Sequence, residues 1–300
     1  MAIGDVYDAE DCADVHYVDT GMYDVPEYGS VYVVDTERPA LVDTGIGANY
    51  ETILEAMDAV GVAHEDLEVI AITHVHLDHA GGAGYLVEEC PNATVYVHEI
   101  GAPHLADPTR LWEGTKQAVG DQVQYYAEPR PVPEERIVEL TDGDSIDLGD
   151  HRLEAHHAPG HAPHQVVFHD PAIDGVFTAD AAGLFTPSVD AVNVTSPPVN
   201  FDLDRALSDI ETIRDLDPET LLYGHFGAEP TGDRLDEYAG KLDAWVSAVR
   251  EKRAELEDDN AVVSHFVETV DTPEVWGEHK AREEVALNVR GVLVMLDRDG

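Results

Sequence analysis

The densest group of metal-binding side chains in the sequence lies at residues 72–82, "ITHVHLDHAGG". Three histidines and one aspartate fall within six positions there, directly after an apolar run and before two glycines: His74, His76, Asp78 and His79. Side chains this polar gain nothing from a hydrophobic core, and three protonated imidazoles held together would repel one another. The segment therefore indicates a loop at the end of a buried strand, where a bound cation holds the side chains together.

Strand and helix signals alternate over the first 225 residues. The segments "GSVYVV" and "PALVDTG" flank a "DTER" turn and predict a β-hairpin. The segment "NYETILEAMDAVG" predicts a helix with Asn49 as its N-cap and Gly61 at its end. Buried strands are expected at "LEVIAI" and "ATVYVH", with a helix at "AGGAGYLVEE" between them. Residues 99–135, rich in proline and charge, predict an inserted helical excursion that forms one wall of a cleft.

The second half of the chain repeats the pattern of the first. Strands are expected at "IVEL", "DSIDL" and "HRLEAHH", and "QVVFHDPAIDGVFTAD" is strand, turn, strand ending in an acid, as is "SVYVVDTERPALVDTG". This similarity predicts a duplicated αβ unit whose two sheets pack together between outer helices. Asp202 is the expected cap of a further helix, and from residue 233 the pattern is helical only. We therefore expect a main domain over residues 1–232 and a C-terminal helical extension over residues 233–300 that packs on it.

Histidine and aspartate recur where the predicted strands end. The further positions of this kind are Asp43, His161, Asp180 and His225. Loops at the carboxyl ends of strands in mixed α/β sheets form rigid platforms for ligands, so we expect one metal site from these residues and the 72–82 segment. His74 and His76 are two apart in an extended segment, so both can bind the same cation. Asp78 and His79 lie where the chain turns into a helix and can serve a second cation. Imidazole with carboxylate suits zinc, although iron and manganese take similar ligands.

Five short segments in this order resemble the motifs of the metallo-β-lactamase superfamily: "LVDTG", "THVHLDH", "APGHA", "FTAD" and "YGHFG". The resemblance spans residues 41–227 and implies an α/β fold, the four-layer αβ/βα sandwich. It also implies roles for the site residues. The first metal would be held by His74, His76 and His161, and the second by Asp78, His79 and His225. Asp180 would bridge the two metals, and Asp43 would orient the ligands from behind.

Two positions indicate which branch of this family the chain resembles. The class B1 and B2 lactamases place a cysteine where this chain has Asp180, and in this respect the chain resembles glyoxalase II and related thioesterases and lactonases. Flavodiiron proteins have glutamate where His76 stands, which disfavours a di-iron oxygen reductase. The longer run "HLDHAGGAGYLVEECPNATVYVH" also resembles a prokaryotic glyoxalase-II-like branch whose members mostly lack assigned substrates.

The resemblance implies a dinuclear zinc-dependent hydrolase in which a metal-bridging hydroxide attacks a small thioester, lactone or related ester. Asp78 and Asp180 are the catalytic candidates, and the cofactors are two zinc ions, with iron or manganese as substitutes. The main alternative is an oxidoreductase similar to the mono-iron persulfide dioxygenases of the same fold. A metal-binding protein without activity is a third reading, but such a protein is expected to have lost a ligand, and every ligand position is kept.

Several aromatic and imidazole side chains outside the ligand set remain open from the sequence. His164 in "GHAPH" can contact substrate, support the ligands by a hydrogen bond, or face solvent. Of His156 and His157 at a strand end, at least one is expected to be structural. For His98 and His104 in the excursion, placement on the surface is favoured over lining the cleft. Packing is the simplest role for three further aromatic residues: Tyr223, Tyr238 and Trp245.

Charge and composition restrict the partners and the compartment. Sixty-two acidic residues face seventeen basic ones, for a net charge of −45. Such a surface resembles that of a halophile's cytosolic protein, and without a basic patch to release phosphate counterions nucleic-acid binding is disfavoured. No apolar run approaches the length of a membrane span and the first residues are acidic, so we expect a soluble cytoplasmic protein with a small-molecule substrate. Cys12 and Cys90 are expected to be reduced, buried thiols. The resemblance also makes a homodimer possible.

Overall fold

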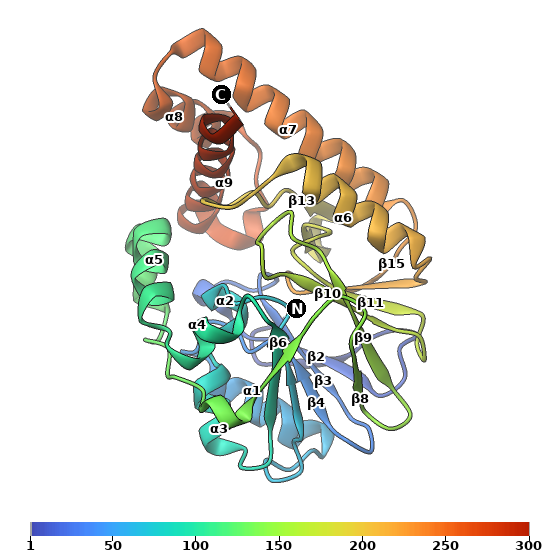
Figure 1. Cartoon of the computed structure of the whole chain (residues 1–300). Coiled ribbons are helices and arrows are strands. Elements are labelled where there is room, and N and C mark those ends of the chain that lie inside the picture. The colour runs from blue at the N-terminus through green and yellow to red at the C-terminus, as the bar shows by residue number, and fades with distance from the viewer. Residues whose placement is uncertain (1, 300) are drawn as a thin grey trace.

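The computed structural model describes residues 2–299, and its two large sheets lie against each other between helices (Figure 1). The first sheet has seven strands in the order β1 (Val6–Asp8), β2 (Val15–Asp19), β3 (Ser30–Val34), β4 (Ala40–Val42), β5 (Val69–Ala71), β6 (Thr94–His98) and β7 (Ile137–Leu140). Its strands are antiparallel from β1 to β4 and parallel from β4 to β7. The hairpin β3–β4 and the two buried strands around the 72–82 segment are confirmed.

The second sheet has six strands in the order β15 (Gly227–Pro230), β14 (Thr220–Tyr223), β11 (Gly175–Ala179), β10 (Val166–Asp170), β9 (Arg152–His157) and β8 (Ser145–Asp147). Only β11 and β14 are parallel among these neighbours. A separate hairpin is formed by β12 (Leu184–Thr186) and β13 (Ala191–Asn193).

Three hydrophobic clusters define the layers. One cluster lies between the sheets and joins residues such as Tyr32 of β3 with Phe168 of β10. A second cluster packs the outer face of the first sheet against α1 (Tyr50–Val60) and α3 (Ala83–Glu89). The third packs the outer face of the second sheet against α6 (Leu203–Asp215) and the C-terminal helices. The predicted α/β sandwich, with helices outside two packed sheets, is confirmed.

The ends of the helices show which of the capping residues predicted from the sequence cap a helix in the structure. Gly61 closes α1 in the left-handed conformation (φ 91°), as its position predicts. Asp202 caps α6 because its side chain accepts a hydrogen bond of 3.0 Å from the backbone N–H of Arg205. Asn49 stands at the N-terminal position of α1, but its side chain donates to the carbonyl oxygen of Thr20 instead of capping the helix.

The predicted excursion is helical. It contains α4 (Ala102–Ala106), α5 (Thr109–Val119) and the short 3-10 helices η2 (Gly120–Tyr125) and η3 (Glu134–Arg136). The helix α5 lies beside α2 (Leu77–Ala80), which the 72–82 segment forms. Other 3-10 turns are η1 (Met22–Asp24), η4 (Pro187–Val189) and η5 (Glu274–Trp276). The excursion therefore lies next to the candidate site, where it was expected to form one wall of a cleft.

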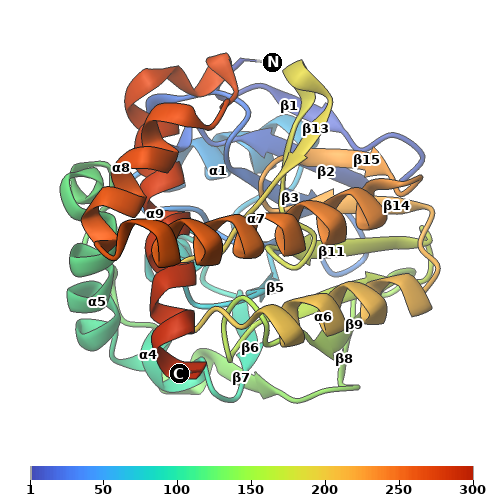
Figure 2. The same ribbon diagram turned by 90° about the horizontal axis from the view of Figure 1, so that it is seen from above.

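Beyond residue 233 the described chain forms α7 (Arg234–Leu256), α8 (Asp259–Thr269), η5 and α9 (Gly277–Asp299). Figure 2 shows α7 running beside α6 above the strands of the second sheet. Leu242 of α7 and Val289 of α9 belong to the same hydrophobic cluster as Val176 and Leu221 of the second sheet. The C-terminal helices thus share a core with that sheet, while the division into two domains stays a prediction. Within residues 2–299, every helix is too short or too polar to cross a membrane.

Candidate metal centre

The predicted site residues meet at one end of the two sheets, in the segments that follow strands. His74 and His76 lie in the loop after β5, Asp78 and His79 in α2, and His161 in the loop after β9. Asp180 directly follows β11, and His225 comes two residues after the end of β14. In both sheets the parallel strand pairs end at this edge, so residues up to 151 positions apart in the sequence come together.

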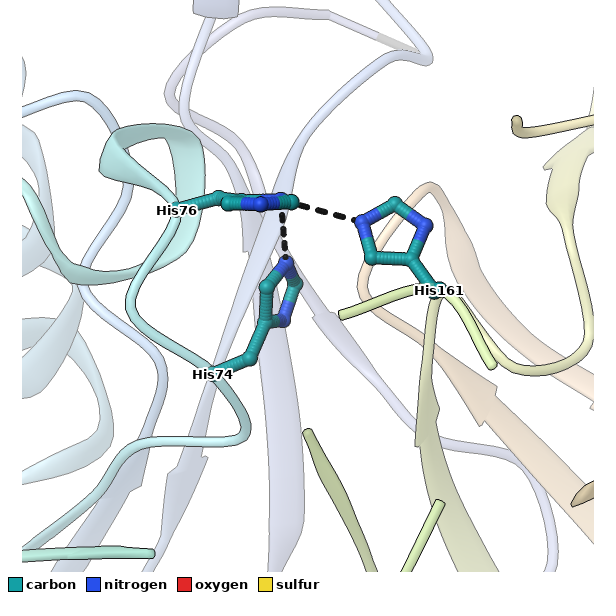
Figure 3. A group of neighbouring side chains, drawn as sticks. All are labelled: His74, His76 and His161. Carbon is teal, nitrogen blue, oxygen red and sulfur yellow. Dashed lines mark hydrogen bonds between the residues drawn. The ribbon is translucent and has the colours of Figure 1, made fainter. Parts of the chain in front are cut away.

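The first group consists of three imidazoles (Figure 3). His76 Nδ1 lies 3.1 Å from His74 Nε2 and 3.0 Å from His161 Nε2. A neutral imidazole offers one donor and one acceptor nitrogen, so three nitrogens that converge on one point cannot all be satisfied by one another. The arrangement is typical of ligands that face a shared cation.

The second group contains Asp78, His79 and His225. The Nε2 atoms of His79 and His225 are 3.1 Å apart, and His225 Nε2 lies 3.8 Å from Oδ2 of Asp78. Both histidines are buried, whereas the Asp78 side chain retains 24% exposure. Asp78 is therefore the most exposed ligand candidate of this group.

Asp180 lies between the two groups. Its Oδ2 is 3.0 Å from His161 Nε2, and its Oδ1 is 3.4 Å from His79 Nε2 and 3.5 Å from His225 Nε2. Among the described residues Oδ1 finds no hydrogen-bond partner, although it is buried. A buried carboxylate oxygen left unpaired costs several kcal/mol, which neighbouring cations would offset. The donor set of imidazole nitrogens and carboxylates fits divalent cations such as zinc.

Hydrogen bonds behind the ligands fix their orientation. Asp43 Oδ2 accepts a 2.8 Å hydrogen bond from His79 Nδ1, and its Oδ1 accepts from the backbone N–H and the hydroxyl of Thr73, each at 2.9 Å. His225 Nδ1 donates to the carbonyl oxygen of Tyr28 at 2.7 Å. Both histidines thereby direct Nε2 toward the centre of the site. Asp43 therefore lies behind a ligand candidate, as the resemblance implied.

His164 is buried and supports the loop that carries the first group. Its Nδ1 accepts a 3.3 Å hydrogen bond from the backbone N–H of Val75, between His74 and His76. Burial, reinforced by the neighbouring His76, lowers the pKa of His164 to about 2, which keeps the ring neutral and able to accept. Of the alternatives left open by the sequence, the structure shows the supporting hydrogen bond, and the ring does not face solvent.

The charges of the centre are set by burial and by the close packing of the ligands. Burial, and then repulsion from His161, lowers the pKa of His76 to about 4. Burial by itself would raise the pKa of Asp180, but His161, His79 and His225 outweigh it and hold that pKa well below its usual range. Burial by itself would also raise the pKa of Asp78, and His79 with His225 reverses the shift. Both carboxylates are therefore ionised at neutral pH, as metal ligands must be.

A cavity of about 90 Å³ opens above the centre. Its far walls come from α5, from the Pro197–Pro198 segment and from α9, and include the buried side chains of Tyr23, Tyr28, Tyr126 and Glu284. None of these four residues was predicted from the sequence to be part of the site. The described residues that line the cavity include neither lysine nor arginine.

Other side chains named from the sequence lie outside the ligand set. The prediction of a surface position for His98 is wrong, because its ring is buried and stacks on His157 at a centroid distance of 4.3 Å. His104 is half-buried. Packing roles are confirmed for Tyr223 and Tyr238, which lie in the core, and Trp245 packs partly buried against the same cluster. Cys12 and Cys90 are buried free thiols, as predicted.

The site and the fold together define a class of protein. The model of the metallo-beta-lactamase superfamily matches residues 24–225, and the chain belongs to that superfamily. The metallo-beta-lactamase fold-containing protein ST1585 of Sulfurisphaera tokodaii is 27% identical over 72% of this chain and 79% of its own length. Its crystal structure superposes with a TM-score of 0.71 at 23% identity, covering 94% of this chain and 99% of that one.

A human relative has a named activity. The acyl-coenzyme A thioesterase MBLAC2 of Homo sapiens is 26% identical over 183 residues, which are 55% of this chain and 62% of that protein. The chain therefore spans less than two thirds of the length of this relative.

Proposed function

We propose that this protein is a dinuclear zinc-dependent hydrolase of the glyoxalase-II-like branch, acting on a small thioester, lactone or related ester. The observation that carries the proposal is the position of Asp180, whose two carboxylate oxygens face two different groups of ligand candidates. A mononuclear site would leave Oδ1 buried beside His79 and His225 with nothing to bind.

The residues divide between two ions. His74, His76 and His161 would hold one, and Asp78, His79 and His225 the other, with Asp180 between them. Two zinc ions bound there would supply Lewis acidity toward a carbonyl oxygen and a water whose pKa is lowered toward neutrality. Asp43 and the carbonyl oxygen of Tyr28 keep the imidazoles in the required tautomer.

Asp78 has a further role in this proposal. Its carboxylate lines the cavity, is partly exposed, and has a pKa held below the usual value, so it is ionised when substrate enters. An ionised carboxylate at this position can orient the attacking water and accept its proton.

The cavity favours a small, uncharged acyl group. Apart from the ligand candidates, Glu284 and the two threonines Thr115 and Thr195, its walls are aromatic and aliphatic. The described lining residues include no lysine or arginine that could pair with a phosphate or carboxylate. The thioester preference draws on the aspartate at position 180, which glyoxalase II and related thioesterases share, and on the similarity to a human acyl-coenzyme A thioesterase.

The proposal is tested by metal analysis and by hydrolysis assays on one preparation, purified in high salt without chelator or metal-affinity tag. We expect close to two tightly held zinc ions per chain and turnover of at least one member of a panel of short-chain thioesters and lactones. Asp180→Ala is expected to lose activity and metal together. About one iron per chain with oxygen uptake on a persulfide would overturn the proposal in favour of a dioxygenase.

A further inference from the structure

A second cluster of metal-binding side chains lies on the second sheet, apart from the seven ligand candidates described above. Glu154 and His156 are on β9, and His169 is on β10. One ligand atom from each of the three lies within 4.8 Å of the others. The cluster shares no residue with the candidate catalytic centre.

Strand register places the three side chains on one face. Glu154 and His169 are directly opposite in the antiparallel pair β9–β10, and His156 is two residues further along β9, opposite Val167. Side chains two apart on a strand, and those directly opposite across a ladder, point to the same face. Val167 packs into the cluster under α6, whereas Phe168 packs between the sheets, so this is the outer face of the sheet.

Two of the three side chains contain buried nitrogen atoms that make no hydrogen bond. Among residues 2–299, neither His156 Nε2 nor His169 Nδ1 finds a hydrogen-bond partner, and both atoms are shielded from solvent. Desolvated polar atoms that make no hydrogen bond are uncommon in folded proteins because each costs about 1–3 kcal/mol. Their lone pairs can be satisfied by a cation.

The carboxylate of Glu154 is arranged to complete the set. Its Oε1 forms an ion pair with Nη2 of Arg152 at 2.5 Å. Its Oε2 lies 3.5 Å from His169 Nδ1, which is within ion-pair distance but longer than a usual hydrogen bond. One oxygen is thus neutralised by an arginine at the surface, and the other lies beside His169 Nδ1, within the cluster that also includes His156.

We propose that Glu154, His156 and His169 form a third cation site, structural in role, for a borderline-soft divalent ion such as zinc. Two imidazole nitrogens and one carboxylate are a ligand set that zinc accepts, with water in the remaining position. The bound ion would cross-link β9 and β10. Since β9 leads directly into the loop that carries His161, the cross-link would stabilise the edge of the sheet next to the candidate catalytic centre.

The test counts zinc ions per chain at equilibrium with buffered zinc, for the wild type and for His156→Gln and His169→Gln. We expect each variant to bind one ion fewer than the wild type, or to bind its weakest ion at least 30-fold less tightly. His279→Gln removes an exposed imidazole from α9 and serves as the matched control, with wild-type stoichiometry expected. The ions retained by the variants report that the fold and the catalytic centre are intact.

Thermal unfolding provides an independent readout. Zinc added to protein that already holds its tight ions should raise the Tm of the wild type and of His279→Gln, but not that of His156→Gln or His169→Gln. Equal stoichiometry and equal zinc-induced Tm shifts in all four proteins would overturn the proposal. Because the test rests on a difference between wild type and variants, its outcome is independent of whether the catalytic centre holds one ion or two.

Discussion

The phenol of Tyr28 donates a 2.6 Å hydrogen bond to Oε2 of Glu284, a residue 256 positions later in the chain. The same carboxylate oxygen receives the ammonium of Lys280 at 2.7 Å, and all three side chains are buried. Since the carbonyl oxygen of Tyr28 orients His225, this contact connects α9 to a ligand candidate of the metal centre. The C-terminal helices therefore support the site and do not merely cover it.

Removing the charge of Glu284 should destabilise the protein strongly. In Glu284→Gln the Lys280 ammonium stays buried over the rings of Tyr23 and Tyr28 without a counter-charge, and breaking a buried pair in this way costs about 3–5 kcal/mol. The double variant Lys280→Met/Glu284→Gln should recover much of that loss, because no unpaired charge remains. Urea unfolding of the two variants and the wild type measures both effects. A single variant as stable as the double would contradict the prediction.

Replacing Asp43 should weaken metal binding without unfolding the protein. In Asp43→Asn the amide oxygen can still accept from Thr73, but the charged acceptor of His79 Nδ1 is lost. Loss of such a supporting carboxylate typically lowers metal affinity by about 10–100-fold. Competition with a chelator of known affinity gives the number. Asp24→Asn, which removes a carboxylate outside this hydrogen-bonded group, is the control, and equal affinity of both variants would count against an orienting role for Asp43.

The grouping of the ligand candidates was predictable from the sequence because each of them follows a strand that is recognisable as an apolar run. Asp180 and His225 come directly after "VFTA" and "LLYG", so the edge of the sheet brings them together without any knowledge of the loops. The fold followed from the same alternation of strands and helices. Where several motifs follow one another in a fixed order, as they do here, the local sequence pattern was enough to predict which side chains come together.

The walls of the cavity could not be predicted in this way. Tyr23 lies in a 3-10 turn and Tyr126 follows one, so neither belongs to a periodic pattern. In the sequence, Glu284 is indistinguishable from an exposed acidic residue on a helix. Its burial depends on the packing of α9 against Tyr28, which is 256 positions away in the sequence. The error for His98 has a similar cause, since its burial comes from stacking on His157 of the other sheet.

Asp209 should make stability depend on pH. Burial raises the pKa of this carboxyl group to about 6, although Oδ2 accepts a hydrogen bond from the backbone N–H of Gly160. A folded-state pKa above the unfolded value of 3.8 means that the folded protein binds the proton more tightly. The contribution of Asp209 to stability is therefore most favourable below about pH 4 and is lost as the pH rises through about 6.

The variant Asp209→Asn keeps an acceptor for Gly160 and cannot ionise. We expect the stability of this variant relative to the wild type to rise by up to about 3 kcal/mol between pH 4 and pH 7, the equivalent of two pKa units. Urea unfolding at fixed ionic strength across this range measures the difference. A constant difference between the two proteins over the range would show that Asp209 does not titrate as proposed.

The net charge of −45 should cause salt to stabilise the folded protein. This is the opposite of the effect of salt on most surface ion pairs, which it weakens. Repulsion among sixty-two acidic residues dominates over the ion pairs that seventeen basic residues can form, and salt screens repulsion between exposed charges. The screening length falls from about 10 Å at 0.1 M to about 3 Å at 1 M salt. We therefore expect the Tm to rise steadily over this range of potassium chloride concentration, with a smaller further gain above 1 M. Sucrose at matched osmolality separates charge screening from general exclusion of cosolute, since it leaves the repulsion in place and should reproduce little of the shift. A Tm that falls or stays level with potassium chloride would show that the acidic surface carries no net repulsion in the folded state, and would remove the physical basis for regarding the protein as halophilic.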